Sequence, residues 1–342
     1  MLPKNKLEEI REELDSCKSP LFFYGRDADG LCSFLLLRKY KGDGVGVSVK
    51  GTLDEMFLRR VDEVNPDKIF ILDTPKLSQD FVDNVKVPIV VIDHHKQEVK
   101  LKGVKDFNTH NFKKGDDSPA STVCYNIVKQ NLWLAAIGTV ADWHLTKETK
   151  EFAKENPDLL DIKIKNPGIA MFTSKIGKVG RMFDFILKGK TKDINKVISE
   201  IDEIKDPREI LEETTTAGRA IHKRYLEYYN EYKGLLEQAE KKATKDKLLL
   251  FTYPSSANSY SGELSNELII KCPKKIIMVC REKEDEFVCS FRSGSINIRS
   301  KVLKVLDKVG ATGGGHEKAL GAIIKKKDFD EFVELFKEEL VL

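Results

Sequence analysis

Short apolar runs alternate with amphipathic segments through the first part of the chain. Compact runs of apolar and aromatic residues occur at 21–25, 68–73 and 88–95, and residues 44–50 alternate in the manner of a strand. The segments between these runs repeat apolar residues with the helical period, beginning with "LCSFLLLRKYK" after Gly30. Strands that alternate with helices favour a parallel sheet with helices on both faces, so the pattern predicts an α/β fold.

The pattern changes in the second part of the chain. It is mainly helical from about 147 to 205, and one helical run with few breakers extends from 206 to 245. Three apolar strands, "KLLLFTY", "KKIIMVCR" and "EFVCSFRS", follow, with helices between and after them. We therefore expect a parallel-sheet domain with a helical extension (1–205), a long connecting helix (206–245) and a smaller α/β domain (246–342).

Charge and composition narrow the class of protein only a little. The 58 Lys and Arg residues against 55 Asp and Glu residues give a net charge of +3, so any basic surface for nucleic acid must be local. No apolar stretch approaches the roughly 20 residues that cross a bilayer, and the N-terminal segment lacks a signal-peptide core. The six cysteines form no C-x-x-C pair, and we expect free thiols. These observations predict a soluble cytoplasmic protein without a membrane partner.

Acids and imidazoles stand at the ends of successive predicted strands. They are Asp27, Asp29, Asp73, Asp93, His94 and His95, with Asp142 at the end of a later helical segment. A single Asp in such a place is more often a helix cap or turn residue, and Asp29 alone fits that description. The carboxyl ends of parallel strands meet at one edge, however, where so many carboxylates repel one another unless cations neutralise them. Mixed carboxylate and imidazole ligands suit two Mn²⁺ ions, with Mg²⁺ as a substitute at oxygen-rich positions.

Four of these segments resemble the ordered motifs of the DHH phosphoesterases. They are "RDADG", "ILDTP", "VIDHHK" and "GTVADW", and the third contains the Asp-His-His that names the family. Further along, "ATGGGHEKALGA" at 311–322 resembles the Gly-Gly-Gly-His signature of the DHHA1 domain. The helical middle of the chain is similar to that of archaeal RecJ-like nucleases. The resemblance thus identifies 1–205 as a DHH catalytic domain and 246–342 as a substrate-binding DHHA1 domain.

The resemblance also implies a role for each matched residue. One metal is expected on Asp27 and Asp73, and a second on Asp29, Asp73, His94 and Asp142, with Asp73 as the bridge. Asp93 is expected to orient the imidazoles and His95 to face the substrate phosphate. A water activated by the two metals is expected to attack phosphorus.

The second domain is expected to bind the substrate. The glycines Gly313, Gly314 and Gly315 allow backbone N–H groups to approach an anion, and His316 can donate to it. Arg292 follows a predicted strand and suits bidentate contact with a phosphate.

One position departs from the family pattern. The first motif of the family begins with His, and this chain has Gly25 there. Either the first metal loses one ligand and catalysis survives, or the site is degenerate and the protein only binds. Because every other ligand is retained, we favour activity. The neighbouring Arg26 is expected either to hold a phosphate or to pair with an acid.

These features together predict a metal-dependent exonuclease that hydrolyses single-stranded DNA or RNA. A phosphodiesterase for short oligonucleotides or cyclic dinucleotides is the alternative within the same chemistry, and a non-catalytic nucleic-acid-binding subunit is the alternative outside it. The expected partners are single-stranded nucleic acid and proteins of DNA replication and repair.

Overall fold

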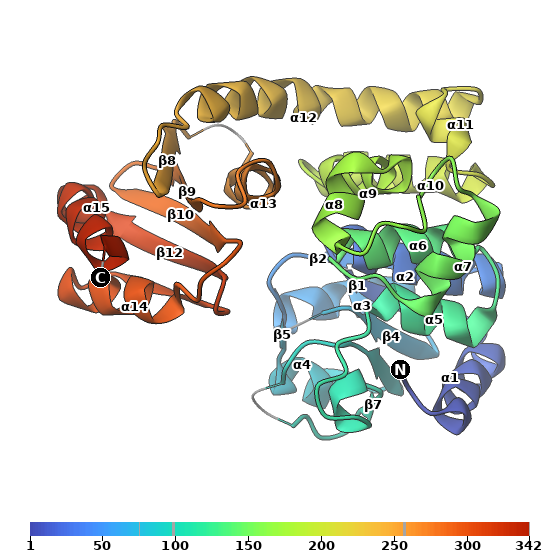
Figure 1. Cartoon of the computed structure of the whole chain (residues 1–342). Helices are drawn as coiled ribbons and strands as arrows, with labels where there is room; N and C mark the ends of the chain where they lie inside the picture. The colour runs from blue at the N-terminus through green and yellow to red at the C-terminus, as the bar shows by residue number, and fades with distance from the viewer. Residues whose placement is uncertain (75, 98–99, 256–257, 342) are drawn as a thin grey trace. The chain divides into compact units, whose positions relative to one another are not determined.

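The protein divides into two compact units. The computed structural model describes residues 1–74, 76–97, 100–255 and 258–341. The first unit is Met1–Tyr225 and the second is Leu226–Leu342 (Figure 1). Within the described residues, no helix combines the length and the apolar character needed to cross a membrane.

The first unit contains a five-stranded sheet in which every neighbouring pair is parallel. In spatial order its strands are β2 (Val45–Val49), β1 (Pro20–Gly25), β4 (Lys68–Leu72), β6 (Ile89–Ile92) and β7 (Lys105–Asp106). A separate parallel pair consists of β3 (Thr52–Leu53) and β5 (Lys76–Leu77). The α/β class predicted from the sequence is confirmed.

Helices cover both faces of this sheet, because alternate strand residues are apolar on both sides. On one face Phe23 and Ile71 pack with residues of α3 (Leu58–Val64) and α4 (Gln79–Asn84). On the other face the Tyr24 ring stacks on Phe34 of α2 (Ala28–Lys41), with ring centroids 4.9 Å apart. The remaining elements up to Ala141 are α1 (Lys4–Ser16), α2 (Ala28–Lys41), η1 (Glu55–Phe57), η2 (Thr109–Asn111), α5 (Ala120–Val128) and α6 (Leu132–Ala141).

A helical extension follows the sheet, and its last helix continues into the second unit. Its helices are α7 (Lys147–Glu155), α8 (Pro167–Thr173), α9 (Lys175–Ile186), α10 (Thr191–Glu203), α11 (Arg208–Leu211) and α12 (Thr216–Lys241). The helical run expected over 206–245 is therefore interrupted. Glu213 takes a left-handed φ of 54°, and the Thr215 hydroxyl accepts from the Gly218 N–H to begin α12. The connecting helix is thus ten residues shorter at its N-terminal end than the pattern indicated.

The second unit has a mixed five-stranded sheet. Its strands in spatial order are β11 (Thr312–Gly315), β12 (Ala319–Lys325), β10 (Glu286–Ser293), β9 (Ile276–Glu282) and β8 (Leu248–Tyr253). Only the β8–β9 pair is parallel among them. The helices α14 (Arg299–Lys308) and α15 (Lys326–Val341) close the core on one face, and α13 (Ser261–Lys271) contacts β9 and β10.

The glycine-rich segment at 312–315, whose backbone is expected to approach an anion, is an edge strand. Glycine is needed there because a Cβ on Gly313 would lie 2.7 Å from the Gly321 carbonyl oxygen. The close pairing of β11 with β12 therefore depends on the absence of side chains.

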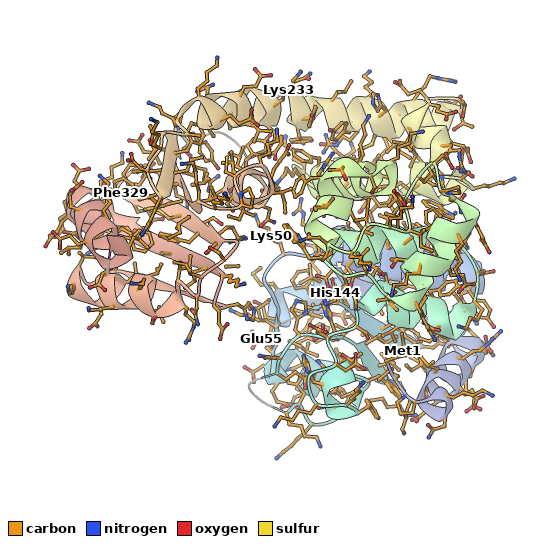
Figure 2. The ribbon with its side chains drawn as sticks, in the orientation of Figure 1. Met1, Lys50, Glu55, His144, Lys233 and Phe329 are labelled. Carbon is orange, nitrogen blue, oxygen red and sulfur yellow. A yellow bond between two sulfur atoms is a disulfide. The ribbon has the colours of Figure 1, made fainter. Side chains whose placement is uncertain are left out.

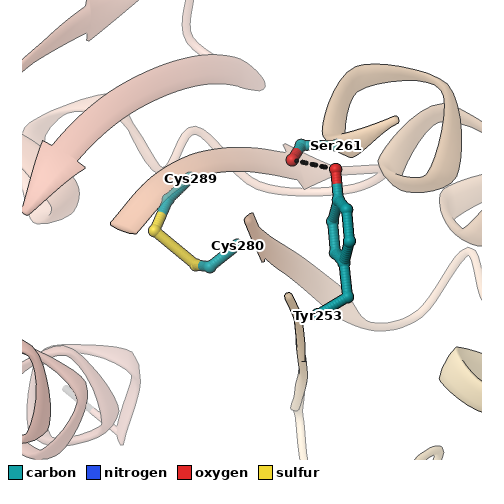
Figure 3. The surroundings of a disulfide bond; sticks show 4 residues. All are labelled: Tyr253, Ser261, Cys280 and Cys289. Atoms are coloured by element: carbon teal, nitrogen blue, oxygen red, sulfur yellow. Dashed lines mark hydrogen bonds between the residues drawn. A yellow bond between two sulfur atoms is a disulfide. The ribbon is translucent and has the colours of Figure 1, made fainter. Parts of the chain in front are cut away.

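Two of the cysteines are joined, which corrects the expectation of six free thiols. Cys280 on β9 and Cys289 on β10 lie directly opposite each other, with Cα atoms 4.0 Å apart, and form a disulfide (Figure 3). The other four, Cys17, Cys32, Cys124 and Cys272, are thiols. The pair was not evident from the sequence because it depends on the register of two antiparallel strands.

Candidate metal centre

The carboxyl ends of β1, β4 and β6 carry the acids and imidazoles that the sequence singled out. Asp73 directly follows β4, and Asp93 and His94 directly follow β6. Asp27 follows β1 by two residues and precedes α2, whose first turn contains Asp29. Asp142 is the C-terminal cap of α6. The fold thus brings together residues that are more than 100 positions apart.

Asp73 lies at the centre of this group. Its backbone has a left-handed φ of 51°, and its N–H donates to the Ile92 carbonyl at 2.9 Å. Its carboxylate is only 2% exposed, and Oδ1 lies 3.2 Å from His94 Nε2. Burial raises the pKa of Asp73 well above its usual range, and the charges of neighbouring carboxylates raise it further. These carboxylates are Asp27, Asp29, Asp93 and Asp142.

The orientation of His94 leaves one ring nitrogen for a ligand. Its Nδ1 lies 3.1 Å from the Asp117 carbonyl oxygen. Because a carbonyl only accepts hydrogen bonds, Nδ1 carries the proton and Nε2 presents a lone pair in the neutral ring. Nε2 faces Asp73 Oδ1 at 3.2 Å and Asp142 Oδ2 at 3.7 Å. Burial lowers the pKa of His94, but the carboxylates of Asp142 and Asp29 outweigh it and the net shift is upward.

Three buried polar atoms converge without hydrogen bonds to any described residue. Asp73 Oδ1, His94 Nε2 and Asp142 Oδ2 have no hydrogen-bond partner in the described part of the chain. Two groups of ligand atoms each fit within 4.8 Å: one from Asp73, His94 and His95, the other from Asp29, His94 and Asp142. Acceptor atoms that face one another repel unless a proton or a cation lies between them. These oxygen and nitrogen donors fit divalent ions such as Mn²⁺ or Mg²⁺.

Asp29 is tied to the N-terminus of α5. Its Oδ2 accepts from the Ala120 N–H at 2.8 Å and its Oδ1 from the Ser121 N–H at 3.1 Å. Burial above all, and then the charge of Asp142, raises the pKa of Asp29 to about 7. A Cβ on Gly138 would lie 2.9 Å from Asp29 Oδ1. Gly138 is therefore part of the site, and its place in the "GTVADW" motif was the available signal.

Asp27, by contrast, caps its own helix. Its Oδ1 accepts from the Gly30 N–H at 2.9 Å, at the start of α2. Neither three-residue ligand group found among the described residues includes Asp27, although its charge raises the pKa of Asp73. The shared member of the two groups is His94.

Asp93 and Asn108 hold the more exposed imidazole. Asp93 Oδ1 accepts from His95 Nδ1 at 2.9 Å, and Asp93 Oδ2 accepts from Asn108 Nδ2 at 3.2 Å. Burial lowers the pKa of His95, but the hydrogen bond to Asp93 outweighs it and the net shift is upward. The His95 side chain remains 38% exposed, so it can meet a ligand from solvent. Asn108 was missed from the sequence because it lies outside every motif.

His144 is a third residue that the sequence did not single out (Figure 2). Its Nδ1 donates to the Asp142 carbonyl at 2.6 Å, and its Nε2 lies 3.4 Å from Asp117 Oδ2. Burial opposes its protonation, but contact with the Asp142 carboxylate raises the pKa of His144 to about 9. The only available signal was its position two residues after Asp142.

Gly25 does not leave space for a side chain. A Cβ there would lie 2.2 Å from the Asp73 carbonyl oxygen and 3.1 Å from Asp73 Oδ2. Because the nearer atom belongs to the backbone, a rotamer change cannot relieve the contact. The space that an imidazole at position 25 would need is thus occupied by the backbone of Asp73, which follows the neighbouring strand β4. Arg26 donates to the carbonyls of Leu187 at 2.8 Å and Gly189 at 2.7 Å, at the end of α9.

The predicted substrate-binding residues of the second unit have a different character. Gly313, Gly314, Gly315 and His316 are all exposed, and the His316 N–H donates to the Ala319 carbonyl at 2.8 Å. Arg292 is held inside the unit: its Nε donates to Asn266 Oδ1 at 2.6 Å and its Nη1 to the Phe291 carbonyl at 2.8 Å. Burial lowers the pKa of Arg292.

Two family models match the sequence. One, described as the DHH family, N-terminal domain, matches residues 23–160, and the other, the DHHA1 domain, matches residues 249–341. No curated protein matches the sequence. The pair of domains inferred from the motifs is confirmed.

Solved structures share the fold. RecJ from Thermus thermophilus in complex with Mn²⁺ has a TM-score of 0.70 and 15% identity, over 98% of this chain and 55% of that chain. An exonuclease RecJ bound to manganese has a TM-score of 0.65 and 15% identity, over 98% of this chain and 94% of that chain. A pGpG-specific phosphodiesterase from Vibrio cholerae has a TM-score of 0.55 and 15% identity, over 95% of this chain and 99% of that chain. This chain spans about half the length of the Thermus thermophilus RecJ. The chain thus contains a domain of the DHH family, N-terminal domain, followed by a DHHA1 domain.

Proposed function

We propose that this protein is a divalent-metal-dependent phosphodiesterase that removes nucleotides from single-stranded DNA or RNA. The observation that carries the proposal is the convergence of Asp73 Oδ1, His94 Nε2 and Asp142 Oδ2, buried and without hydrogen-bond partners among the described residues. Such an arrangement costs free energy in the absence of cations, so its retention argues for a working metal site. The names of two similar structures, which describe RecJ bound to manganese or Mn²⁺, support the choice of metal.

The side chains divide the work of binding. Asp29, Asp73, His94 and Asp142 would hold one cation, and Asp27 with Asp73 the other. Bound cations supply the Lewis acidity that activates water and neutralises a phosphate. His95, held by Asp93 and partly open to solvent, donates to a phosphate oxygen. In the second unit, exposed His316 and the backbone of 313–315 bind a further phosphate.

A second substrate class has its own support. The Vibrio cholerae phosphodiesterase is named for a dinucleotide, and its chain is matched over 99% of its length. Cleavage of short oligonucleotides or cyclic dinucleotides is therefore the alternative within the same chemistry. A binding subunit without catalysis is the alternative that Gly25 raised. The backbone contact at Gly25 argues against this non-catalytic alternative. Glycine at this position is explained by the close packing of the Asp73 backbone, so it need not reflect the loss of a metal site.

The test is a Mn²⁺ titration with labelled single strands of graded length, followed on a sequencing gel. We expect Mn²⁺-dependent cleavage and a ladder of shortened products on long strands. Cleavage restricted to dimers through tetramers would transfer the proposal to short oligonucleotides. If the folded protein cleaves neither strands, nor short oligonucleotides, nor cyclic dinucleotides, the proposal becomes that of a binding subunit without catalysis.

A further inference from the structure

The residue after Asp142 has an unusual backbone conformation. At the end of α6 the Trp143 N–H donates to the Val140 carbonyl at 3.1 Å, and the His144 N–H donates to the Thr139 carbonyl at 2.9 Å. These two bonds form a Schellman motif, in which the residue at the position of Trp143 is usually glycine. Trp143 has a left-handed φ of 60°. A bulky side chain in this conformation is an outlier that asks for a functional reason.

The indole of Trp143 contacts an aromatic ring on another helix, and a cation lies over that ring. Its ring centroid lies 6.1 Å from that of Phe172 on α8, at an interplanar angle of 66°. The guanidinium carbon of Arg181 on α9 lies 5.0 Å from the Phe172 centroid, and Arg181 Nη1 donates to the Met171 carbonyl at 2.8 Å. Trp143, Phe172 and Arg181 are all only partly buried. An aromatic group backed by a cation is therefore accessible at the surface of the first unit.

This aromatic group adjoins the metal centre through the chain itself. Asp142 and His144, the neighbours of Trp143 on both sides, face the site, where His144 Nδ1 lies 3.1 Å from Asp142 Oδ2. A nucleotide whose phosphate is bound by the metal centre extends its base only a few ångströms from that phosphate. Because Trp143 is bonded to both Asp142 and His144, its backbone lies within one residue of the site, and its partly exposed indole offers a face on which a base can stack.

We propose that Trp143, packed against Phe172, forms a stacking subsite for the nucleobase next to the scissile phosphate. The inference rests on the proposed function, and it adds a specificity: the substrate must carry an aromatic base at this position. The strained backbone has a purpose in this arrangement. With glycine in place of Trp143 the helix would end with less strain, but the stacking surface would be lost.

Fluorescence provides a readout that does not depend on activity. The chain has two tryptophans, and Trp133 is only 6% exposed, so the Trp133→Phe variant isolates the signal of Trp143. In the full-length protein with Mn²⁺, we expect saturable quenching by adenosine monophosphate and none by ribose 5-phosphate at equal concentration. Equal quenching by both compounds, or by neither, would overturn the proposal.

The Trp143→Gly variant separates stacking from packing. We expect a melting temperature equal to or above that of the parent, because a left-handed φ suits glycine. We also expect about 10-fold weaker binding of adenosine monophosphate, in the range for loss of one stacked base. The Trp143→Phe variant should keep most of that affinity. A lower melting temperature in the Gly variant with unchanged nucleotide affinity would show that Trp143 serves packing and not the base.

An abasic substrate distinguishes the subsite from the hydrolysis. A single strand without a base next to the scissile phosphate should be cleaved equally by the parent and by Trp143→Gly, whereas the matched intact strand should be cleaved more slowly by the variant, through KM. A larger loss on the abasic strand would overturn the subsite. If no substrate is cleaved but base-selective quenching is seen, the hydrolytic function fails and the subsite stands. If cleavage is seen without base-selective quenching, the hydrolytic function stands and the subsite fails.

Discussion

The two units hold their candidate functional residues in opposite environments. In the first, Asp29, Asp73 and His94 are buried and charged or protonatable, and Asp73 is surrounded by four other carboxylates. In the second, His316 and the glycines of β11 are exposed, and the nearby Arg292 is held by Asn266 and a carbonyl.

The difference has an energetic consequence. The cluster in the first unit destabilises the fold whenever its carboxylates are ionised without cations, so metal binding and folding are coupled there. No comparable cluster of carboxylates and imidazoles is found in the described part of the second unit. Cations should therefore stabilise the first unit and leave the second unchanged, whereas substitutions in the second should affect substrate without affecting metal.

The largest expected effect comes from Asp73→Asn, which keeps the size and tolerates a left-handed φ. The rate of hydrolysis should fall by more than about 100-fold. Replacing even a residue that only hydrogen-bonds a metal ligand lowers metal affinity or activity by about 10- to 100-fold. The metal-free variant should melt at a higher temperature than the parent, since the repulsion is relieved. Calorimetry and thermal unfolding with and without Mn²⁺ provide the measurement. Asp62→Asn, at an exposed position of α3, is the matched control. An Asp73→Asn protein that still binds two Mn²⁺ ions would refute the central place of Asp73.

Gly25→His tests whether the first unit has a vacated ligand position. Because a Cβ would meet the Asp73 carbonyl at 2.2 Å, we expect a loss of stability of at least about 1–3 kcal/mol and weaker Mn²⁺ binding. Gly25→Ala should behave in the same way. Gly234→Ala on α12, with open space around its Cβ, is the control. If Gly25→His instead lowers the Mn²⁺ concentration needed for cleavage, the strand contact is not the reason for glycine.

His316→Ala sharpens the comparison from the side of the second unit. Loss of one donor to a charged phosphate should weaken binding of single strands by about 10-fold or more. The Mn²⁺ affinity should be unchanged, because the residue lies outside the metal centre. Filter binding and calorimetry provide the two readouts, with Glu331→Ala on α15 as an exposed control. A parallel loss of Mn²⁺ affinity would contradict the division of labour.

The pH dependence should show the coupling between metal and fold. Burial raises the pKa of Asp29 to about 7, so ionisation of Asp29 reduces stability as the pH rises from about 4 to about 7. The raised pKa of His94 acts in the same direction, because its stabilising protonated form is lost as the pH rises through that pKa. Mn²⁺ should therefore raise the melting temperature more at about pH 8 than at about pH 5. Equal shifts at both values would show that the carboxylates are not coupled to the metal.

The smallest effect concerns the disulfide of the second unit. Unfolded without reductant, the protein should expose four reactive thiols, and with reductant six. Reduction should lower the stability of the second unit by about 2–3 kcal/mol and leave Mn²⁺ binding intact. Six thiols without reductant would show that Cys280 and Cys289 are not joined.

The sequence was sufficient for the order and type of the main elements and for the place of the acids. Runs such as 21–25 and 68–73 are apolar on both faces because helices cover both sides of a parallel sheet. The carboxyl ends of such strands share one edge, so Asp73 and the Asp93–His95 segment could be expected to lie near each other from their positions alone. The family motifs added the second domain.

Only the tertiary structure decided what each residue does within that frame. Whether Gly25 is a gap depends on the distance between two strands that meet from separate parts of the chain. Asp27 caps its own helix and Asp29 caps α5, yet both are acids of one short motif. The Cys280–Cys289 pair and the left-handed Trp143 likewise depend on strand register and on how a helix ends. A local pattern records which side chains are buried, but not which distant backbone atom or side chain comes within a few ångströms of them, and that proximity determines the chemistry of this site.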